Sequence, residues 1–166
     1  MMHKKRESEE PLLPIYSQSR ADCNDGRVVN RWINTGMPIS SGTMRFYEPL
    51  QGCVGDCAFI AALSAVAHAA KASLRSYNNY AFYSPEKGIW ESSKLVDTKL
   101  AIDINNNIVY ARTSSGYIWP CLYEKAYAKW KDPNHNDPPD IGTILAPGGG
   151  GLTALLHICG GLYYQK

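Results

Sequence analysis

The pattern of apolar and polar residues predicts three helices. Between Cys57 and about Leu74, apolar side chains occupy nearly every position, which is typical of a buried central helix rather than an amphipathic surface helix. From Trp119 to Trp130, apolar residues recur at the spacing of a single helix face, and Pro120 suits the first helical turn. A short helix from Leu152 to Ile158 is predicted after the glycine run at 148–151.

Between the first two helices the pattern changes to that of extended chain. Lys94–Ile104 and Ile108–Arg112 are rich in β-branched and apolar residues. Asn105–Asn107 lies between them, and because asparagine tolerates positive φ, a β-hairpin is predicted there. Gly26–Leu50 is interrupted by glycines and prolines, and we expect a covering loop with a short helical turn around Val28–Ile33.

Length and composition indicate one folded domain. The chain has 166 residues, of which 45% are hydrophobic and 19% charged, enough for a single domain with its own core. Residues 1–22 are polar and charged without a sustained period. They are predicted to form a flexible tail before a domain that covers residues 23–166.

Charge and apolar length limit the partners and the location. The formal net charge is +2, and the sequence has no basic stripe with interleaved aromatic residues, so it does not favour nucleic-acid binding. The longest apolar stretch, residues 58–70, is too short to span a bilayer, and the N-terminus lacks the apolar core of a signal peptide. We therefore predict a cytoplasmic protein with neither nucleic-acid nor membrane partners.

The cysteines do not have the pattern of a disulfide scaffold. Five cysteines are an odd number, and their spacing is not compact, unlike the dense even set of small secreted proteins. We therefore predict free thiols in a reducing compartment, most of them small core residues. They are Cys23, Cys53, Cys57, Cys121 and Cys159.

Cys57 is the candidate nucleophile. A cysteine attacks as its thiolate, and the first turn of a helix places the sulfur near unpaired N–H groups and the positive end of the helix dipole. The dipole contributes only about 0.3–1 kcal/mol, so a histidine must also act as base or ion-pair partner. Asp56 is a good N-cap residue for this helix, and Gly55 permits a tight entry turn.

Gln51 is the candidate oxyanion donor. It lies six residues before Cys57, so its side-chain amide can reach back toward the sulfur. Together with the backbone N–H of Cys57, this amide would bind the oxyanion of a tetrahedral intermediate. Glycines at positions 52 and 55 leave room for a peptide substrate to approach the loop.

Two motifs resemble the calpain family of cysteine proteases. Gln-Gly-x-x-Gly-Asp-Cys at residues 51–57, which opens an apolar helix, is similar to the catalytic-cysteine motif of that family. Residues 118–129 are similar to the family helix whose core reads Trp-x-x-Leu-Leu-Glu-Lys-Ala-Tyr-Ala-Lys. With the hairpin between them and the glycine-rich stretch after them, the resemblance covers roughly Leu50 to Gly161 in the same order.

The resemblance implies a fold and a reaction. The fold would be α+β: the mainly helical, cysteine-bearing half of a papain-like calpain catalytic domain, with a β-hairpin. The reaction would be the cleavage of a protein or peptide substrate by a cysteine endopeptidase, through an acyl-thioester on Cys57. Within the second helix, Glu124 and Lys125 are interpreted as structural or solvated side chains without a chemical role.

The chain departs from the family pattern at two positions near the cysteine motif. Ala58 stands where the family has tryptophan, and the nearest aromatic residue is Phe59, which changes the wall beside the sulfur. Calcium-gated calpains carry a glutamate where this chain has Tyr117, whereas Glu48 matches an acidic ligand of the same site. A lone carboxylate is a poor site for a cation that prefers six to eight oxygens, so calcium is weakly supported and no other cofactor is predicted.

The four histidines do not complete the site. His68 is about 16 Å along the predicted helix from Cys57 and cannot reach its sulfur. His3 lies in the tail and His135 in a proline-rich loop, and we interpret His157 as a core or edge histidine rather than a substitute base. In the family, histidine and asparagine come from a second subdomain, so we expect a second catalytic half, on this chain or a partner, to supply them.

A catalytically inactive calpain relative is the main alternative. Such a protein would bind or regulate other proteins, and the loss of the second half and of the tryptophan at Ala58 would favour it. The intact Gln51–Cys57 pair argues against it, because a binding module has no need for an oxyanion donor.

Two further sites have less support in the sequence. A metal site formed by Cys53, Cys57 and His68 or His157 would lack a second ligand pair at zinc spacing. Gly148–Gly151 is not followed by Gly-Lys-Ser/Thr, so this run is interpreted as a flexible loop rather than a phosphate-binding loop.

Overall fold

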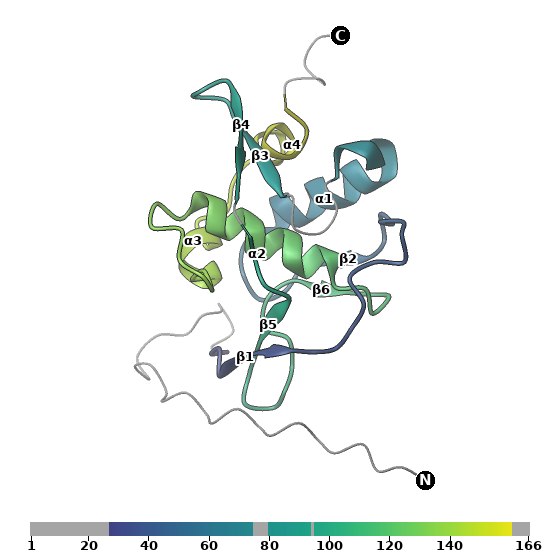
Figure 1. Cartoon of the computed structure of the whole chain (residues 1–166), viewed down its shortest axis with the longest axis vertical. Helices are drawn as coiled ribbons and strands as arrows, with labels where there is room; N and C mark the ends of the chain where they lie inside the picture. The colour runs from purple at the N-terminus through teal and green to yellow at the C-terminus, as the bar shows by residue number, and fades with distance from the viewer. Residues whose placement is uncertain (1–26, 75–79, 94, 161–166) are drawn as a thin grey trace.

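The computed structural model describes residues 27–74, 80–93 and 95–160, and these residues form a mixed α and β structure (Figure 1). The α+β class predicted from the sequence is confirmed. In chain order the elements are β1 (Arg31–Asn34), β2 (Pro49–Leu50), α1 (Cys57–Ala69), the 3₁₀ helix η1 (Lys71–Ser73), β3 (Ala81–Ser84), β4 (Ile89–Ser92), β5 (Lys99–Ile102), β6 (Arg112–Thr113), α2 (Trp119–Lys131), α3 (Ile141–Leu145) and α4 (Gly151–Cys159).

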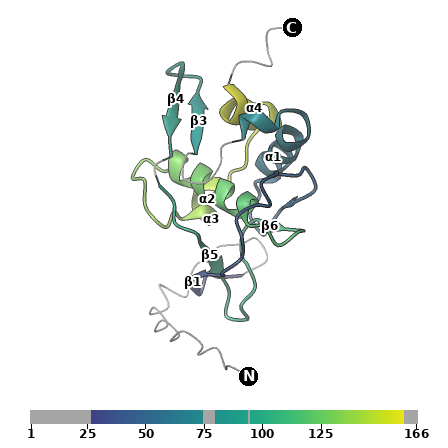
Figure 2. The ribbon, with the colours of Figure 1, turned by 45° about the vertical axis from the view of Figure 1, so that its right-hand side comes forward.

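Helix α2 runs through the middle of the structure. On one side of it lie α1, α4 and the β3–β4 hairpin, and on the other side lies the β1–β5 pair (Figures 1 and 2). Because α2 is covered on both sides, its residues from Trp119 to Lys129 are all buried, whereas the sequence pattern predicted a single buried face. The ring of Phe59 on α1 stacks on that of Tyr127 on α2, with 4.1 Å between ring centroids.

The three predicted helices are confirmed, with one boundary changed. Helix α1 ends at Ala69, and the chain continues as the short η1 turn instead of remaining α-helical to Leu74. The covering loop contacts the start of α2, where the backbone N–H groups of Ile118 and Trp119 donate to the carbonyls of Pro38 and Ile39. These bonds satisfy donors that the first turn of a helix leaves unpaired.

The short helical turn predicted around Val28–Ile33 is wrong, because this segment contains a strand. β1 pairs antiparallel with β5, with Arg31 opposite Ile102. The Trp32 ring packs near Tyr110, with 6.3 Å between centroids, and under the Lys125 ammonium. A partner about 70 residues further along the chain decides the conformation here, so local propensity is overridden.

The predicted turn at Asn105–Asn107 is confirmed. Ile102 and Ile108 form an antiparallel bridge, and Asn106 has a φ of +64°. The Asp103 carboxylate accepts the N–H groups of Asn105 and Asn107 at 2.8 and 2.9 Å, which stabilises the turn. The flanking strands pair elsewhere: β5 pairs with β1, and β6 pairs with β2.

The pattern analysis missed the short strand β2, the β3–β4 hairpin and helix α3. The β3–β4 hairpin pairs Ala81 with Ser92 and Ser84 with Ile89, and Gly88 in its turn has a φ of +68°. Helix α3 is short, and Asp140 caps it by accepting the Thr143 N–H at 3.1 Å. Asp-x-x-Thr after a proline pair is the local signal for this helix start.

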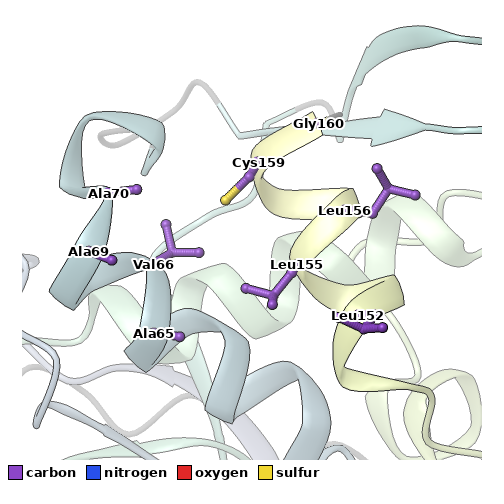
Figure 3. Close-up of a pocket in the computed structure, with 9 residues that line it drawn as sticks. All are labelled: Ala65, Val66, Ala69, Ala70, Leu152, Leu155, Leu156, Cys159 and Gly160. Carbon is purple, nitrogen blue, oxygen red and sulfur yellow. The ribbon is translucent and has the colours of Figure 1, made fainter. Parts of the chain in front are cut away.

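An apolar cavity of about 260 Å³ lies between α1 and α4. Val66 points into it from α1, and Leu155 and Cys159 point into it from α4 (Figure 3). The α1 residues that line it belong to the C-terminal half of that helix, so the cavity is separate from Cys57 at the other end. Among the described residues, no helix has the length and apolar character needed to cross a bilayer.

The prediction that all five thiols are free is wrong for Cys53, which is disulfide-bonded. Cys57, Cys121 and Cys159 are free, while Cys23 and the predicted tail at residues 1–22 lie outside the described residues. A disulfide requires two Cα atoms within about 7 Å. That spatial relation is not visible in the spacing of cysteines along the chain.

Alkylation without reductant is expected to distinguish the free thiols from the disulfide-bonded Cys53. In denaturant, iodoacetamide should modify Cys57, Cys121 and Cys159 but leave Cys53 unmodified until a reductant is added. Peptide mass mapping with and without the reductant measures this. Full modification of Cys53 in the unreduced chain would contradict the disulfide.

Substitution of Gly52 by alanine is expected to destabilise the fold. An added Cβ at position 52 would lie 2.1 Å from the Tyr110 carbonyl oxygen, so two backbone segments would have to separate. Overpacking of this kind costs about 1–3 kcal/mol or more, which urea unfolding followed by circular dichroism can measure. The matched control is Gly149→Ala, whose Cβ would enter open space. Equal stability of the two variants would contradict the close approach.

Candidate active site

Cys57 is the first residue of α1, and its side chain is exposed. The helix begins here because the Asp56 carbonyl accepts the N–H groups of Phe59 and Ile60 at 2.8 and 3.1 Å. The thiol therefore lies where the helix dipole and the unpaired N–H groups of the first turn favour a negative charge. This is the position that the sequence analysis predicted for a nucleophile.

The side chain of Gln51 is held inside its own loop. Its amide donates to the Val54 carbonyl at 2.9 Å, and its backbone carbonyl accepts a hydrogen bond from Arg112 at 3.4 Å. A primary amide has two N–H donors, so this contact leaves a second donor for a ligand. Gln51 and Cys57 are both exposed, at the two ends of one short loop.

The loop between Gln51 and Cys57 is fixed by the neighbouring chain segment at 109–112. Leu50 pairs with Arg112, and the Cys53 N–H donates to the Val109 carbonyl at 3.3 Å. Gly52 approaches the Tyr110 backbone so closely that no side chain fits between them. The start of the loop is thus attached to this segment by backbone contacts.

Asp56 does not cap α1 with its side chain, which corrects the simple N-cap interpretation. No side-chain capping bond is present, and the residue is only 3% exposed. Both carboxylate oxygens are buried without a hydrogen-bond partner. The carboxyl group instead turns inward toward α2, where it meets Glu124.

Glu124 is buried in the middle of α2, so of the two roles considered for it, structural or solvated, the solvated one is wrong. One of its carboxyl oxygens accepts the Ala111 N–H at 2.8 Å, and the other has no partner. Burial raises the pKa of Glu124 well above its usual range, and the nearby Asp56 charge raises it further. Burial also raises the pKa of Asp56, although the hydrogen-bonding contact with Glu124 acts in the opposite direction. A glutamate in an otherwise aromatic and apolar helix face was the available signal.

Lys125 is also buried. Of the two roles considered for it, structural or solvated, the solvated one is therefore wrong. Its ammonium forms an ion pair with Asp97 and donates to the carbonyls of Asp97 and Lys99 at 3.2 and 3.0 Å. Burial acts to raise the pKa of Asp97, but the hydrogen bond from Lys125 holds it below its usual value. Lys125 therefore has a structural role, joining α2 to the chain that leads into β5.

Glu48, the candidate calcium ligand, is buried and its oxygens are engaged by hydrogen-bond donors. One oxygen accepts from the Trp119 indole at 2.6 Å and from the Arg45 N–H at 2.8 Å. The other accepts the Ser115 hydroxyl at 2.8 Å. A cation at this carboxylate would have to displace these donors, and Tyr117 offers no carboxylate beside it. The residues around Glu48 do not fit a calcium site.

The described histidines have contacts away from Cys57. His68 packs against the Phe46 ring, with 5.2 Å between centroids. His157 bonds the Tyr127 hydroxyl at 2.7 Å, and burial lowers its pKa. His135 lies 3.1 Å from the Lys129 carbonyl. His3 is outside the described residues.

The metal site considered for Cys53, Cys57 and a histidine is not supported by the geometry. Within the described ranges, no group of three or more histidine, cysteine, aspartate or glutamate side chains could hold a metal ion. Cys53 is moreover part of a disulfide, which removes it as a thiolate ligand.

Comparison with known proteins identifies the class of protein. Residues 30–136, more than half of the chain, match the family model described as calpain family cysteine protease. The matched region contains both Gln51 and Cys57. The chain therefore belongs to the calpain family of cysteine proteases.

Two curated relatives illustrate the distance within this family. The chain is 33% identical to Calpain-13 of Rattus norvegicus over 102 residues, which cover 55% of this chain and 15% of that protein. It is 30% identical to a thiol protease of Porphyromonas gingivalis (strain ATCC BAA-308 / W83) over 145 residues, which cover 76% of this chain and 30% of that protein. The chain thus spans less than a third of the length of either relative.

Removal of the Glu48 carboxylate is expected to destabilise the loop before Gln51. Glu48→Ala would leave the N–H groups of Trp119 and Arg45 without an acceptor in the interior. The loss should be about 3 kcal/mol or more in the free energy of unfolding, measured by urea titration. Glu48→Gln, which retains an acceptor oxygen, should lose less.

The same measurement tests whether calcium has a role at Glu48. Addition of calcium chloride or of a chelator should leave the unfolding midpoint of the wild-type chain unchanged, because no oxygen of Glu48 is free for a cation. A stabilisation by calcium that Glu48→Gln abolishes would contradict this assignment.

Proposed function

We propose that this chain is the nucleophile-bearing half of a calpain-type cysteine endopeptidase, with Cys57 as the attacking thiol. The observation that carries the proposal is the exposed Cys57 thiol at the first position of α1, with the Gln51 amide held at the other end of the same short loop. Membership of a cysteine protease family supports it.

The residues of this half would act at two points of the reaction. The Cys57 thiolate attacks the carbonyl carbon of the scissile peptide bond, and the carbonyl oxygen becomes an oxyanion. The free N–H of the Gln51 amide and the Cys57 backbone N–H then stabilise this oxyanion. When the amine leaves, an acyl-thioester remains on Cys57, and water hydrolyses it to release the second product and restore the thiol.

A second catalytic half would supply the histidine and asparagine. The histidine would take the proton of Cys57 and return it to the leaving amine, and the asparagine would orient the imidazole. The greater length of both relatives supports a partner subdomain, on the same chain or another. The substrate would be an extended segment of a protein or peptide, bound between the two halves.

Exposed apolar side chains beside Gln51 are consistent with a covered face. Phe46, Tyr47 and Leu50 are 52%, 48% and 40% exposed and directly precede the oxyanion donor. A soluble chain leaves few such clusters uncovered unless they meet a partner or substrate. We infer that this cluster faces the substrate or the second half.

An inactive relative that binds or regulates other proteins is the second candidate. The observation that favours it is Ala58, which stands directly after Cys57 where the family has tryptophan and so changes the wall beside the sulfur. This function would retain the exposed loop as a binding surface without turnover. We also propose a cytoplasmic location. Because stable disulfides are rare in a reducing compartment, a Cys53 disulfide in the protein from its natural source would contradict this location.

Peptidase assays on the protein isolated from its natural source test the proposal. Cleavage of a denatured protein substrate is expected, and Cys57→Ala should abolish it. Gln51→Ala should lower kcat about 100-fold or more with little change in KM, because the oxyanion exists only in the transition state.

The matched control is Cys121→Ser, since Cys121 is a buried thiol whose pKa is raised by burial and then by the charge of Glu124. Activity of this variant should follow its stability alone. Cleavage that survives Cys57→Ala would refute the catalytic assignment. Absence of cleavage by the wild-type protein, with substrate binding intact, would support the inactive relative.

A further inference from the structure

Three carboxylate oxygens are buried without a partner where α1 meets α2. They are both oxygens of Asp56 and one oxygen of Glu124, side chains that are only 3% and 1% exposed. Each of the two carboxyl groups affects the pKa of the other through a side-chain hydrogen-bonding contact, so they are neighbours in the interior. As two carboxylates they would have no proton to donate, and each would repel the other in an apolar interior.

Within the described residues, neither carboxyl group forms an ion pair, and the groups that face them are mostly neutral. From α2 these are Tyr127 and Cys121, and the 109–111 segment contributes the Ala111 N–H. Lys131 lines a small cavity of about 40 Å³ beside Asp56, together with the uncharged loop at 148–150 and Leu145 of α3.

The hydrogen bonds define where one proton would lie. One oxygen of Glu124 already accepts from Ala111, so a proton on the other oxygen can be donated to an Asp56 oxygen. This single proton pairs the orphaned oxygen of Glu124 with one of the two on Asp56. It also removes one of two like charges from the interior.

We propose that Asp56 and Glu124 share one proton, and that Glu124 is a positioning residue that holds both ends of the Gln51–Cys57 loop. At one end, the shared proton attaches Asp56, and with it the first turn of α1, to α2. At the other end, Glu124 binds Ala111, next to Arg112, which pairs with Leu50 and donates to the Gln51 carbonyl.

One carboxyl group thereby fixes the separation between the oxyanion donor and the nucleophile. The inference rests on the proposed function only in assigning that geometry to catalysis. The proton-sharing pair itself is a property of the fold and can be tested without any turnover.

The pair makes the stability of the site depend on pH. Burial, followed by the charge of Asp56, raises the pKa of Glu124, and burial raises that of Asp56. Groups with raised folded-state pKa values stabilise the fold below their unfolded pKa values, and this contribution is lost as pH rises through the folded values. Loss of the shared proton would place two negative charges in contact and separate the start of α1 from α2.

Glu124→Gln is the decisive variant. A glutamine oxygen can accept from Ala111 while its amide donates to Asp56, so it imitates the protonated glutamate but cannot lose the proton. Asp56→Asn tests the same hydrogen bond with the donor reversed, because the asparagine amide can donate to the Glu124 oxygen. Glu124→Ala removes both contacts, and Glu91→Gln, at a partly exposed glutamate paired with Lys87, is the matched control.

The experiment measures three quantities for the 166-residue chain from pH 5 to 10: the urea midpoint, the near-ultraviolet circular dichroism and the rate of Cys57 alkylation by iodoacetamide. We expect the wild type and Glu91→Gln to lose stability together as pH rises above about 4 to 5, the unfolded pKa range. Glu124→Gln and Asp56→Asn should have a flatter stability profile, and their Cys57 alkylation rates should rise with pH only as far as thiolate formation requires.

The carboxyl ¹³C resonance of Glu124, assigned by its absence in Glu124→Gln, should report a protonated carboxyl group at neutral pH. An ionised carboxylate at pH 6, or a Glu124→Gln stability profile identical to that of the wild type, would overturn the shared proton. A folded Glu124→Ala with unchanged Cys57 alkylation would overturn the positioning role. If Glu124→Ala does not fold, the alkylation profile of Glu124→Gln decides that role, since a pH profile identical to that of the wild type would refute it.

Failure of the proposed function gives a different result. A native protein without peptidase activity would leave the pH dependence and the Glu124 resonance unchanged. If an active protease lacked both the pH dependence and the protonated Glu124 resonance, the shared proton would be refuted and the proposed function would stand.

Discussion

The buried contact between the first turn of α1 and the middle of α2 determines where Cys57 lies. Phe59 stacks on Tyr127, and one turn earlier Asp56 meets Glu124. An apolar stack tolerates small displacements, whereas a hydrogen bond between two buried carboxyl groups has a defined length and direction. The stack therefore joins the two helices by apolar contact, and the proposed polar pair sets their register.

Buried polar groups also organise the chain before Gln51. Glu48 accepts from the Trp119 indole, the Arg45 backbone and the Ser115 hydroxyl, and so joins the covering loop to α2. Three donors around one carboxylate compensate much of the free energy lost by removing the charge from water. Glu48 thus joins two segments of the chain through hydrogen bonds rather than through a bound cation. The tyrosine at position 117, which offers no second carboxylate, agrees with this role.

Several elements hold the loop that carries the candidate site. Contacts within the described residues, through β2, β6, α1 and α2, position Cys57 and Gln51. The described histidines have contacts away from the thiol. Under the proposed function, Cys57 and Gln51 would therefore need a histidine from outside this part of the chain.

The sequence by itself determined the helices, the turn at Asn105–Asn107 and the place of Cys57 at a helix start, because each depends on local periodicity or residue type. It also indicated the family, through motifs whose residues are close together along the chain. Only the tertiary structure decided that α2 is buried on all sides and that Cys53 is disulfide-bonded. The same holds for Glu124, whose side chain would be solvated on an isolated helix. Its partners Asp56 and Ala111 are far from it along the chain, so folding alone determines its environment and its proton.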